Sequence, residues 1–318
     1  MIKFFTIVLV LLLSATPFQT LAAPRAAKQC TDLFKGPSEK PLAQALEDMD
    51  LDEPEVEAKL LVPDSVNFKS LKDLVGKKLQ LLDADGNRIA YQVEFNKEHI
   101  YEDTYFDVKK GDELLLFAQN AVLRQRKRYD RNEGEKKFTA RYVNIQAKDG
   151  TTRNLGLNES IYARNEIRGD KTDDFEEFQD KIEKRMSDKK KSKDRAIRFA
   201  RELVASKKPF QPVLSVYQER YFMKISPVGK KNDGAPSFYL SLDKVNYKAL
   251  IGEKNKASER LVEIEVIDDL SQTSAKEAAK KLYLLDVLTT QIQDKYRLIA
   301  SPDDKYASGV RKTILKSN

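Results

Sequence analysis

The stretch Glu55-Val56-Glu57-Ala58-Lys59-Leu60 (EVEAKL) alternates charged and apolar residues along its whole length. Successive side chains of a β-strand point to opposite faces of a sheet, so the alternation predicts a strand with one charged and one apolar face. Far along the chain, Val262-Glu263-Ile264-Glu265-Val266 repeats the pattern and again puts two glutamates on one face. Like charges repel, so stability alone gives no reason for two such pairs, although an antiparallel sheet often keeps one wet face.

Polar residues two apart also recur in the strand candidates between these two stretches. The sets that share a face are Arg124, Arg126 and Arg128; Thr139 and Arg141; Arg164 and Glu166; and Tyr239, Ser241 and Asp243. Paired carboxylates suit Mg²⁺ or Mn²⁺ as oxygen ligands, and arginine or lysine suits phosphate oxygens. Closing the strands into a barrel would place both kinds of side chain around one cavity.

The remaining pattern predicts an α+β protein built mainly from antiparallel strands. Asp85-Gly86-Asn87 is a strong hairpin signal between two short strand patterns. Helical spacing favours a short helix at Lys69–Val75 and longer ones at Asp173–Lys207 and Ser274–Gln293. Strands and helices do not alternate, so a parallel βαβ sheet is not expected.

The amino-acid composition excludes several classes of protein and of functional site. Of 318 residues 34% are charged, with 57 Lys+Arg against 50 Asp+Glu and a net charge of +7, so the chain is no polycationic tail. One cysteine and one histidine exclude a disulfide scaffold and a multi-histidine metal site. A catalytic triad would have to use His99 as its base, so chemistry is expected from carboxylates, lysine and arginine.

The chain divides into four parts. A secretory signal is indicated by Lys3, the apolar run Ile7–Leu13 and the segment Thr20-Leu21-Ala22, which ends in a small residue. Residues 1–22 are therefore interpreted as a signal peptide. Residues 23–50 are expected to be a lead-in, 51–300 one domain and 301–318 a C-terminal tail. The protein is therefore expected to be exported, periplasmic or extracellular, without a stable transmembrane span. An uncleaved signal would anchor it in the membrane.

The segment Lys181–Lys208 is strongly basic, with twelve basic and four acidic residues. A solvated helix face explains such a run in most proteins. A nucleic-acid or anionic-surface partner is not the main expectation, but this segment is where one would bind, with steeply salt-dependent affinity.

The ordered motifs resemble those of a known superfamily. Glu55-Val56-Glu57-Ala58-Lys59 resembles the E-x-E-x-K signature of the CYTH domain, or triphosphate tunnel metalloenzyme, superfamily. The similarity continues in order through Asp103–Asp107, Leu123–Arg126, Thr139–Arg141, Arg164–Glu166, Tyr217–Arg220, Leu242–Asp243 and Glu263–Glu265. It spans about residues 54–295, and Pro212–Glu265 also resembles the polyphosphate polymerase domain of vacuolar transporter chaperones.

The resemblance implies an eight-stranded antiparallel β-tunnel with flanking helices, a charged interior, a triphosphate or polyphosphate ligand and a divalent metal, Mg²⁺ or Mn²⁺. It implies metal-binding roles for Glu55, Glu57, Glu263 and Glu265, phosphate-binding roles for Lys59, Arg124, Arg126, Arg141, Arg164 and Arg220, and places in the tunnel wall for Glu166 and Asp243. Glu265, positioning the attacking water, and Lys59 are the expected catalytic residues. Gln218 and Arg141 depart from the superfamily, which often has lysine at both positions.

The function expected from these residues is metal-dependent hydrolysis of inorganic triphosphate, polyphosphate or an organic triphosphate. Phosphoryl transfer depends on positioning and charge stabilisation more than on covalent chemistry, which suits a chain without a plausible triad. A non-catalytic binder of phosphorylated ligands on the same fold is the alternative, and polymerase-like activity is a third reading. Nucleotide donors are scarce outside the cytoplasm, so an exported hydrolase or binder is easier to defend than a polymerase.

Overall fold

The computed structural model describes residues 54–119, 121–130, 137–149, 160–168, 210–229, 234–267, 274–301 and 303–315. The expected signal peptide 1–22, the lead-in 23–50 and the expected helix Asp173–Lys207, with the basic segment Lys181–Lys208, lie outside these residues and stay predictions. Among the described helices, none is long and apolar enough to cross a membrane.

The main sheet contains ten strands: β1 (Pro54–Leu61), β2 (Lys78–Leu82), β3 (Arg88–Asp107), β6 (Ala121–Asp130), β7 (Lys137–Asp149), β8 (Ile161–Arg168), β9 (Gln211–Pro227), β10 (Phe238–Ala249), β11 (Lys256–Val266) and β12 (Ile299–Ala300). A small hairpin consists of β4 (Lys109–Lys110) and β5 (Glu113–Leu114). The described helices are η1 (Phe68–Leu74), α3 (Leu115–Ala118), α6 (Ala275–Tyr296) and α7 (Lys305–Thr313).

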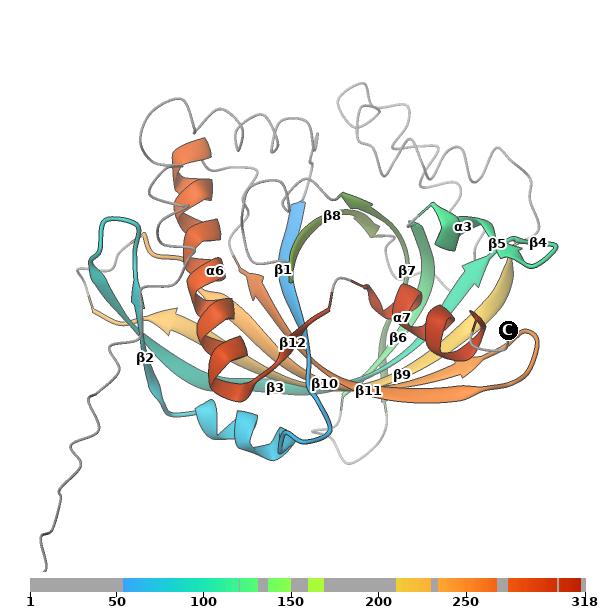
Figure 1. Cartoon of the computed structure of the whole chain (residues 1–318), viewed down its shortest axis with the longest axis horizontal. Coiled ribbons are helices and arrows are strands. Elements are labelled where there is room, and N and C mark those ends of the chain that lie inside the picture. Colours follow the sequence, from blue (N-terminus) through green and yellow to red (C-terminus); the bar gives the residue numbers. More distant parts are fainter. Residues whose placement is uncertain are drawn as a thin grey trace, which may run out of the picture.

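The sheet curls until its strand pairings return to their start (Figure 1). From β1 they run through β11, β10, β9, β3, β6, β7 and β8, and β8 pairs with β1 again. Glu57 shows both contacts of β1, since it stands opposite Glu265 on β11 and opposite Tyr162 on β8. Every described pairing is antiparallel, which confirms the prediction of an antiparallel, β-rich α+β fold.

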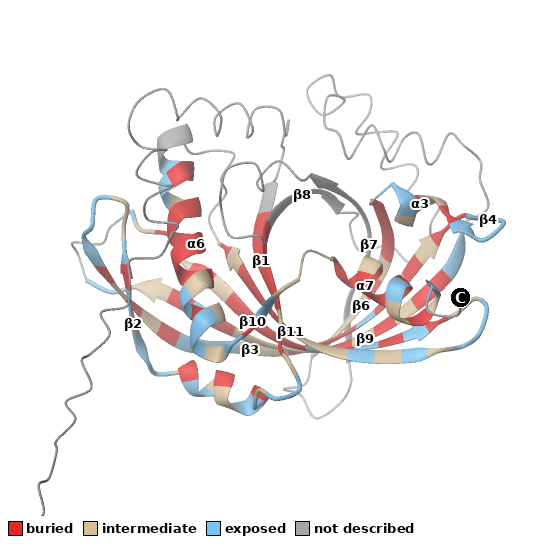
Figure 2. Cartoon of the chain, in the orientation of Figure 1, coloured by how far each residue is buried: buried red, intermediate tan, exposed pale blue. Residues whose placement is uncertain are grey.

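The outer face of the sheet carries the larger apolar core. Val56, Ala58 and Leu60 of β1 are buried there together with alternate residues of β10 and β11, and α6 covers them (Figure 2). The helix begins at a capping box in which Ser274 and Glu277 satisfy each other's backbone N–H groups. The predicted helix Ser274–Gln293 is thus confirmed, as are the short helix after Asn67 and the turn at Asp85-Gly86-Asn87, where Gly86 has φ +83°.

A second apolar cluster fills one end of the inner face, and α7 completes it. Val122, Val216, Val245 and other inner residues of β3, β6, β9, β10 and β11 pack with Tyr306 and Val310 of this helix. Tyr306 stacks on Tyr105 with ring centroids 5.3 Å apart. Residues 301–318, which the sequence led us to treat as a tail, therefore include a helix that closes the apolar end of the curled sheet.

We expect Gly309→Ala to destabilise the protein by about 1–3 kcal/mol, because a side chain there would overpack this cluster. A Cβ atom at Gly309 would lie 2.5 Å from Leu214 Cδ2 and 2.7 Å from Tyr247 Cδ1, and both neighbours are buried. The free energy of unfolding in urea measures the effect. An unchanged midpoint would mean that α7 does not pack as closely as the structure has it.

Candidate functional site

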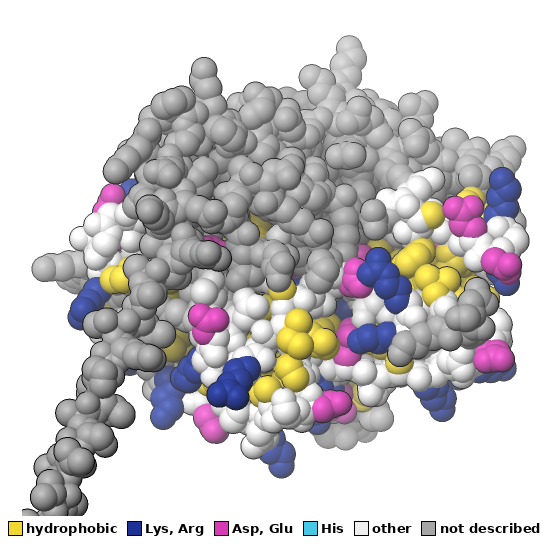
Figure 3. All heavy atoms as spheres, in the orientation of Figure 1, with side chains coloured by type: hydrophobic (Ala, Val, Ile, Leu, Met, Phe, Trp, Pro, Cys, Tyr) yellow, Lys and Arg dark blue, Asp and Glu magenta, His cyan; other side chains and the backbone are white. Residues whose placement is uncertain are grey.

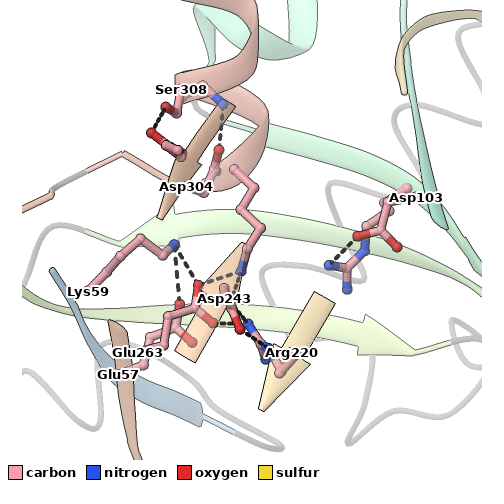
Figure 4. A network of polar contacts seen from close by, with 12 residues as sticks. Glu57, Lys59, Asp103, Arg220, Asp243, Glu263, Asp304 and Ser308 are labelled. Atoms are coloured by element: carbon pink, nitrogen blue, oxygen red, sulfur yellow. Dashed lines mark hydrogen bonds and ion pairs between the residues drawn. The ribbon is translucent and has the colours of Figure 1, made fainter. Parts of the chain in front are cut away.

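Charged side chains occupy the inner face beyond the apolar cluster. The larger set, named the β1–β11 ion-pair group, consists of Glu57, Lys59, Arg220, Asp243, Glu263 and Lys305. They come from β1, β9, β10, β11 and α7 and meet at one place (Figure 4). Each has a side-chain exposure of 13% or less. Such burial is rare for charges unless they are paired, so this group is built around mutual neutralisation.

Glu263 lies at the centre of that group. Its Oε1 accepts a hydrogen bond of 2.5 Å from Lys305 Nζ and lies 3.4 Å from Lys59 Nζ, and its Oε2 accepts one from Arg220. Burial alone would raise the pKa of Glu263, but the charges of Arg220, Lys305 and Lys59 outweigh it and hold that pKa well below its ordinary value. Glu263 is therefore a carboxylate surrounded by cations.

Arg220 and Asp243 form a two-pronged pair beside Glu263. Strands β9 and β10 place these two residues directly opposite each other, and Arg220 donates from Nε and from a terminal nitrogen over 2.7 and 2.5 Å. Lys305 Nζ lies 3.1 Å from the same carboxylate. Burial would lower the pKa of Arg220, yet Asp243 and Glu263 raise it well above its usual value. Arg220 thus stays charged.

The second set, named the β3–β6 ion-pair group, consists of Asp103, Arg124 and Arg126. Arg126 binds Asp103 through two hydrogen bonds of 2.7 Å, and an Arg124 nitrogen lies 3.6 Å from the same carboxylate. Burial raises the pKa of Asp103, but the two guanidinium groups together bring it below the usual value. Two arginines thus share one aspartate in this group.

The structure brings together part of the site predicted from the sequence. Glu57, Lys59, Arg220, Asp243 and Glu263 lie in one group, and Arg124 and Arg126 lie on the inner face of β6 in the other. Glu265 is half-buried and stands opposite Glu57 on β1 and Tyr239 on β10.

Four predicted site residues are described by their backbone alone. Glu55 stands opposite Arg164 in the pairing of β1 with β8, Arg141 opposite Lys127, and Glu166 opposite Gln146. Their side chains lie outside the described part of the structure. The roles of Glu55, Arg141, Arg164 and Glu166 stay predictions.

Two residues of these groups were missed by the sequence analysis. Asp103 falls in a noted motif but was given no role, and its buried charge is paired with Arg124 and Arg126 of β6. Lys305 belongs to α7, whose start has one sequence signal, the N-cap Asp304 that accepts a hydrogen bond of 2.6 Å from the Ala307 N–H. Nothing local marks Lys305, because its partners lie some forty to sixty residues away along the chain.

The described carboxylates do not form a ready site for a divalent cation. Both oxygens of Glu263 are engaged by side-chain cations, and Glu57 Oε1 lies 3.6 Å from Lys59 Nζ. Among the residues that the structure describes, no three Asp, Glu, His or Cys side chains are grouped as metal ligands. Hard cations such as Mg²⁺ need several oxygen ligands that are free to coordinate, and the two oxygens of Glu263 are held by lysine and arginine.

Charges of both signs are interspersed over the described surface on the face shown in Figure 3. On that face, lysine and arginine do not gather in one region among the described residues. Among the described residues, cations gather instead in the two ion-pair groups of the inner face.

Comparisons with protein-family models and with curated proteins give no match for the chain. Solved structures do match. HpAC1 from Hippeastrum, an adenylyl cyclase candidate reported to have a dominant triphosphatase activity, is 14% identical, with 82% of this chain and 97% of that chain covered and a TM-score of 0.43. The PH1819 protein from Pyrococcus horikoshii OT3 is 16% identical, with 81% and 99% covered and a TM-score of 0.40.

The RNA triphosphatase Pct1 of S. pombe also matches, at 12% identity, with 86% of this chain and 93% of that chain covered and a TM-score of 0.33. Two of these three proteins are described as triphosphatases. At these identities and TM-scores the neighbours alone assign no function, so the case for one rests on the residues of this chain.

Proposed function

We propose that the chain binds the phosphate chain of a triphosphate or polyphosphate inside its curled sheet and hydrolyses it. The observation that supports the proposal is the gathering of five buried cations, Lys59, Arg124, Arg126, Arg220 and Lys305, on one inner face. In the ligand-free protein these cations are held by the carboxylates of Glu57, Asp103, Asp243 and Glu263, and a phosphate chain supplies the dense negative charge that would take the place of those carboxylates. Strands at both ends of the chain contribute, so the fold itself builds the site.

In this proposal the sheet is a tunnel of eight strands, β1, β11, β10, β9, β3, β6, β7 and β8. The return of the pairings to β1 supports it. Because α7 fills the apolar end, the ligand would enter from the other end and reach the β1–β11 group beside Lys305.

In this proposal the cations would exchange their carboxylate partners for phosphate groups of the ligand. Arg126 holds Asp103 in the two-pronged geometry that also fits two phosphate oxygens, so its guanidinium is already oriented for a phosphate group, and Asp103 would keep Arg124 as its partner. Lys59 and Lys305 would offset charge on the phosphoryl group under attack, and Glu265 would position the attacking water. No covalent intermediate with the chain is needed.

Whether hydrolysis requires a divalent metal is to be tested by experiment. The glutamates predicted as ligands, Glu57 and Glu263, are ion-paired as described above, and the steps assigned to the cations do not require a metal. If Mg²⁺ or Mn²⁺ binds through Glu263, it would compete there with Lys305 and Arg220.

Binding without turnover is the second candidate function. The pairing of every carboxylate in the β1–β11 group with a cation favours it, because a stable, charge-balanced group can hold an anion without activating water. Only a measurement of product separates the two functions.

The test is a phosphate-release assay on purified protein with tripolyphosphate, polyphosphate, ATP and thiamine triphosphate. Each substrate is tried with Mg²⁺, with Mn²⁺ and with a chelator, beside calorimetric binding of the same compounds. Release of phosphate from at least one of them is expected. Binding without release would leave the second function, and absence of binding would sink both.

A further inference from the structure

Two neutral polar side chains on the inner face have no hydrogen-bond partner within the described part of the chain. They are Gln218, whose amide nitrogen and oxygen are both unpaired, and Ser241, whose hydroxyl is unpaired. Their exposures are 0% and 2%, so bulk water does not reach them. Buried polar groups are nearly always satisfied, and an exception needs an explanation.

Both residues lie beside the charged groups. Gln218 is two residues before Arg220 on β9, which puts their side chains on the same face of that strand. In the pairings it stands opposite Tyr101 on β3, the ring on which Arg126 packs at 4.4 Å. Gln218 therefore lies between the β1–β11 group and the β3–β6 group.

Ser241 has a similar place on the other side of the Arg220–Asp243 pair. It is two residues before Asp243 on β10 and stands opposite Glu263 on β11. Two unsatisfied neutral groups thus flank one ion pair, Gln218 along β9 and Ser241 along β10.

Packing does not account for Gln218. Its strand neighbour on the same face, Val216, and its partner on β10, Val245, both belong to the apolar cluster closed by α7. An apolar side chain would suit that boundary and would leave no donor or acceptor unpaired. The unpaired carboxamide of Gln218 lowers the stability of the ligand-free protein. Such a loss of stability is typical of a group that finds its hydrogen-bond partner only when a ligand binds.

We infer that Gln218 contacts the bound ligand and determines which ligand fits, an inference that rests on the proposed function. Its amide N–H would donate to a phosphate oxygen, and its carbonyl oxygen would accept a hydrogen bond from a hydroxyl of the ligand, since only a donor can satisfy it. Ser241 would donate a second neutral hydrogen bond. The ligand therefore carries a hydrogen-bond donor next to a phosphate oxygen, such as a protonated phosphate or a hydroxyl of an organic group.

The experiment compares Gln218→Met with the wild-type protein by calorimetric titration with inorganic tripolyphosphate and with ATP. We expect the variant to bind at least one of them about tenfold more weakly, the loss of one to two hydrogen bonds. A loss of similar size with both compounds assigns both hydrogen bonds to the phosphate chain, and a larger loss with ATP assigns the bond to the carbonyl oxygen to the organic group. Gln211→Met, an exposed position on the same strand, is the matched control and should bind as the wild type does.

Thermal unfolding in the absence of ligand distinguishes a role of Gln218 in contacting the ligand from a role in stabilising the fold. If Gln218 has no partner in the free protein, Gln218→Met leaves the unfolding temperature unchanged or raises it, whereas a structural glutamine would lower it. Ser241→Ala should behave in the same way, with a smaller loss of affinity.

Unchanged affinity for both compounds in Gln218→Met, or weaker binding that is accompanied by a lower unfolding temperature, would overturn the inference. Failure of the wild-type protein to bind either compound would instead contradict the proposed function, so the two failures are distinguishable.

Discussion

Replacing Asp103 with asparagine is expected to destabilise the protein by about 3–5 kcal/mol, since it leaves buried charges without their partner. Asp103 is 1% exposed and is the shared carboxylate of Arg124 and Arg126. Asparagine has nearly the same shape but no charge, and its amide nitrogen cannot accept a hydrogen bond from Arg126, so the change removes the charge and one acceptor together. The free energy of unfolding, from urea titration at neutral pH, measures it.

Glu102→Gln is the matched control, because Glu102 is the next residue back on β3 and its side chain is exposed. We expect that change to stay within about 0.5 kcal/mol of the wild type. The double variant Asp103→Asn with Arg126→Gln should cost less than the sum of the two single changes, since each removes the other's partner. Equal losses for Asp103→Asn and Glu102→Gln would show that the β3–β6 group is not a buried ion-pair system.

Asp103 also makes the free energy of unfolding depend on pH, in a direction that follows from its lowered pKa. Its pKa in the folded protein lies below the unfolded value, because two arginines outweigh the effect of burial. The stabilisation from Asp103 is therefore complete above about pH 4, the unfolded pKa, and is lost as the pH falls through the lower folded pKa. Unfolding free energies measured from pH 7 down to pH 3 should show the wild type converging on Asp103→Asn.

Much of the fold follows from local alternation in the sequence. In Val56–Leu60 the apolar residues pack under α6 and the charged ones enter the inner face, as a period of two requires. The same holds for Val262–Val266, and the two stretches become neighbours because β1 and β11 pair with Lys59 opposite Glu263. The alternation of residues within each strand thus predicted which face of the sheet each charged side chain occupies.

Which charges become partners could not be predicted in this way. Asp103 and Arg126 are 23 residues apart and Lys305 and Glu263 are 42 apart, and each pair depends on how the sheet closes. Lys305 is the clearest example. It follows a helix cap in residues 301–318, which the sequence pattern predicts to be a tail. Its role exists because Tyr306 and Val310 anchor α7 in the apolar end of the sheet.

Replacing Lys59 with methionine is expected to reduce phosphate release by about 100- to 1,000-fold, the usual loss when one preorganised group that stabilises developing charge is removed. Lys59 Nζ lies 3.6 Å from Glu57 and 3.4 Å from Glu263, with the side chain almost fully buried. It is a fixed cation in a water-poor space, where its charge acts more strongly on a phosphoryl group than it would in solvent. Methionine keeps the length and apolar stem of the side chain and removes only the charge.

Three further measurements identify the cause of that loss. Lys244→Met, a lysine on β10 whose side chain is 59% exposed, should release phosphate at the wild-type rate, which excludes a general effect of net charge. Lys59→Arg retains a cation and should recover part of the activity, while the unfolding temperature of each variant shows whether the β1–β11 group still holds together. If Lys59→Met releases phosphate within about twofold of the wild type while staying folded, the cations of the inner face do not act on the phosphoryl group, since losing even one such group costs far more than that. The gathering of charges would then serve binding or stability alone.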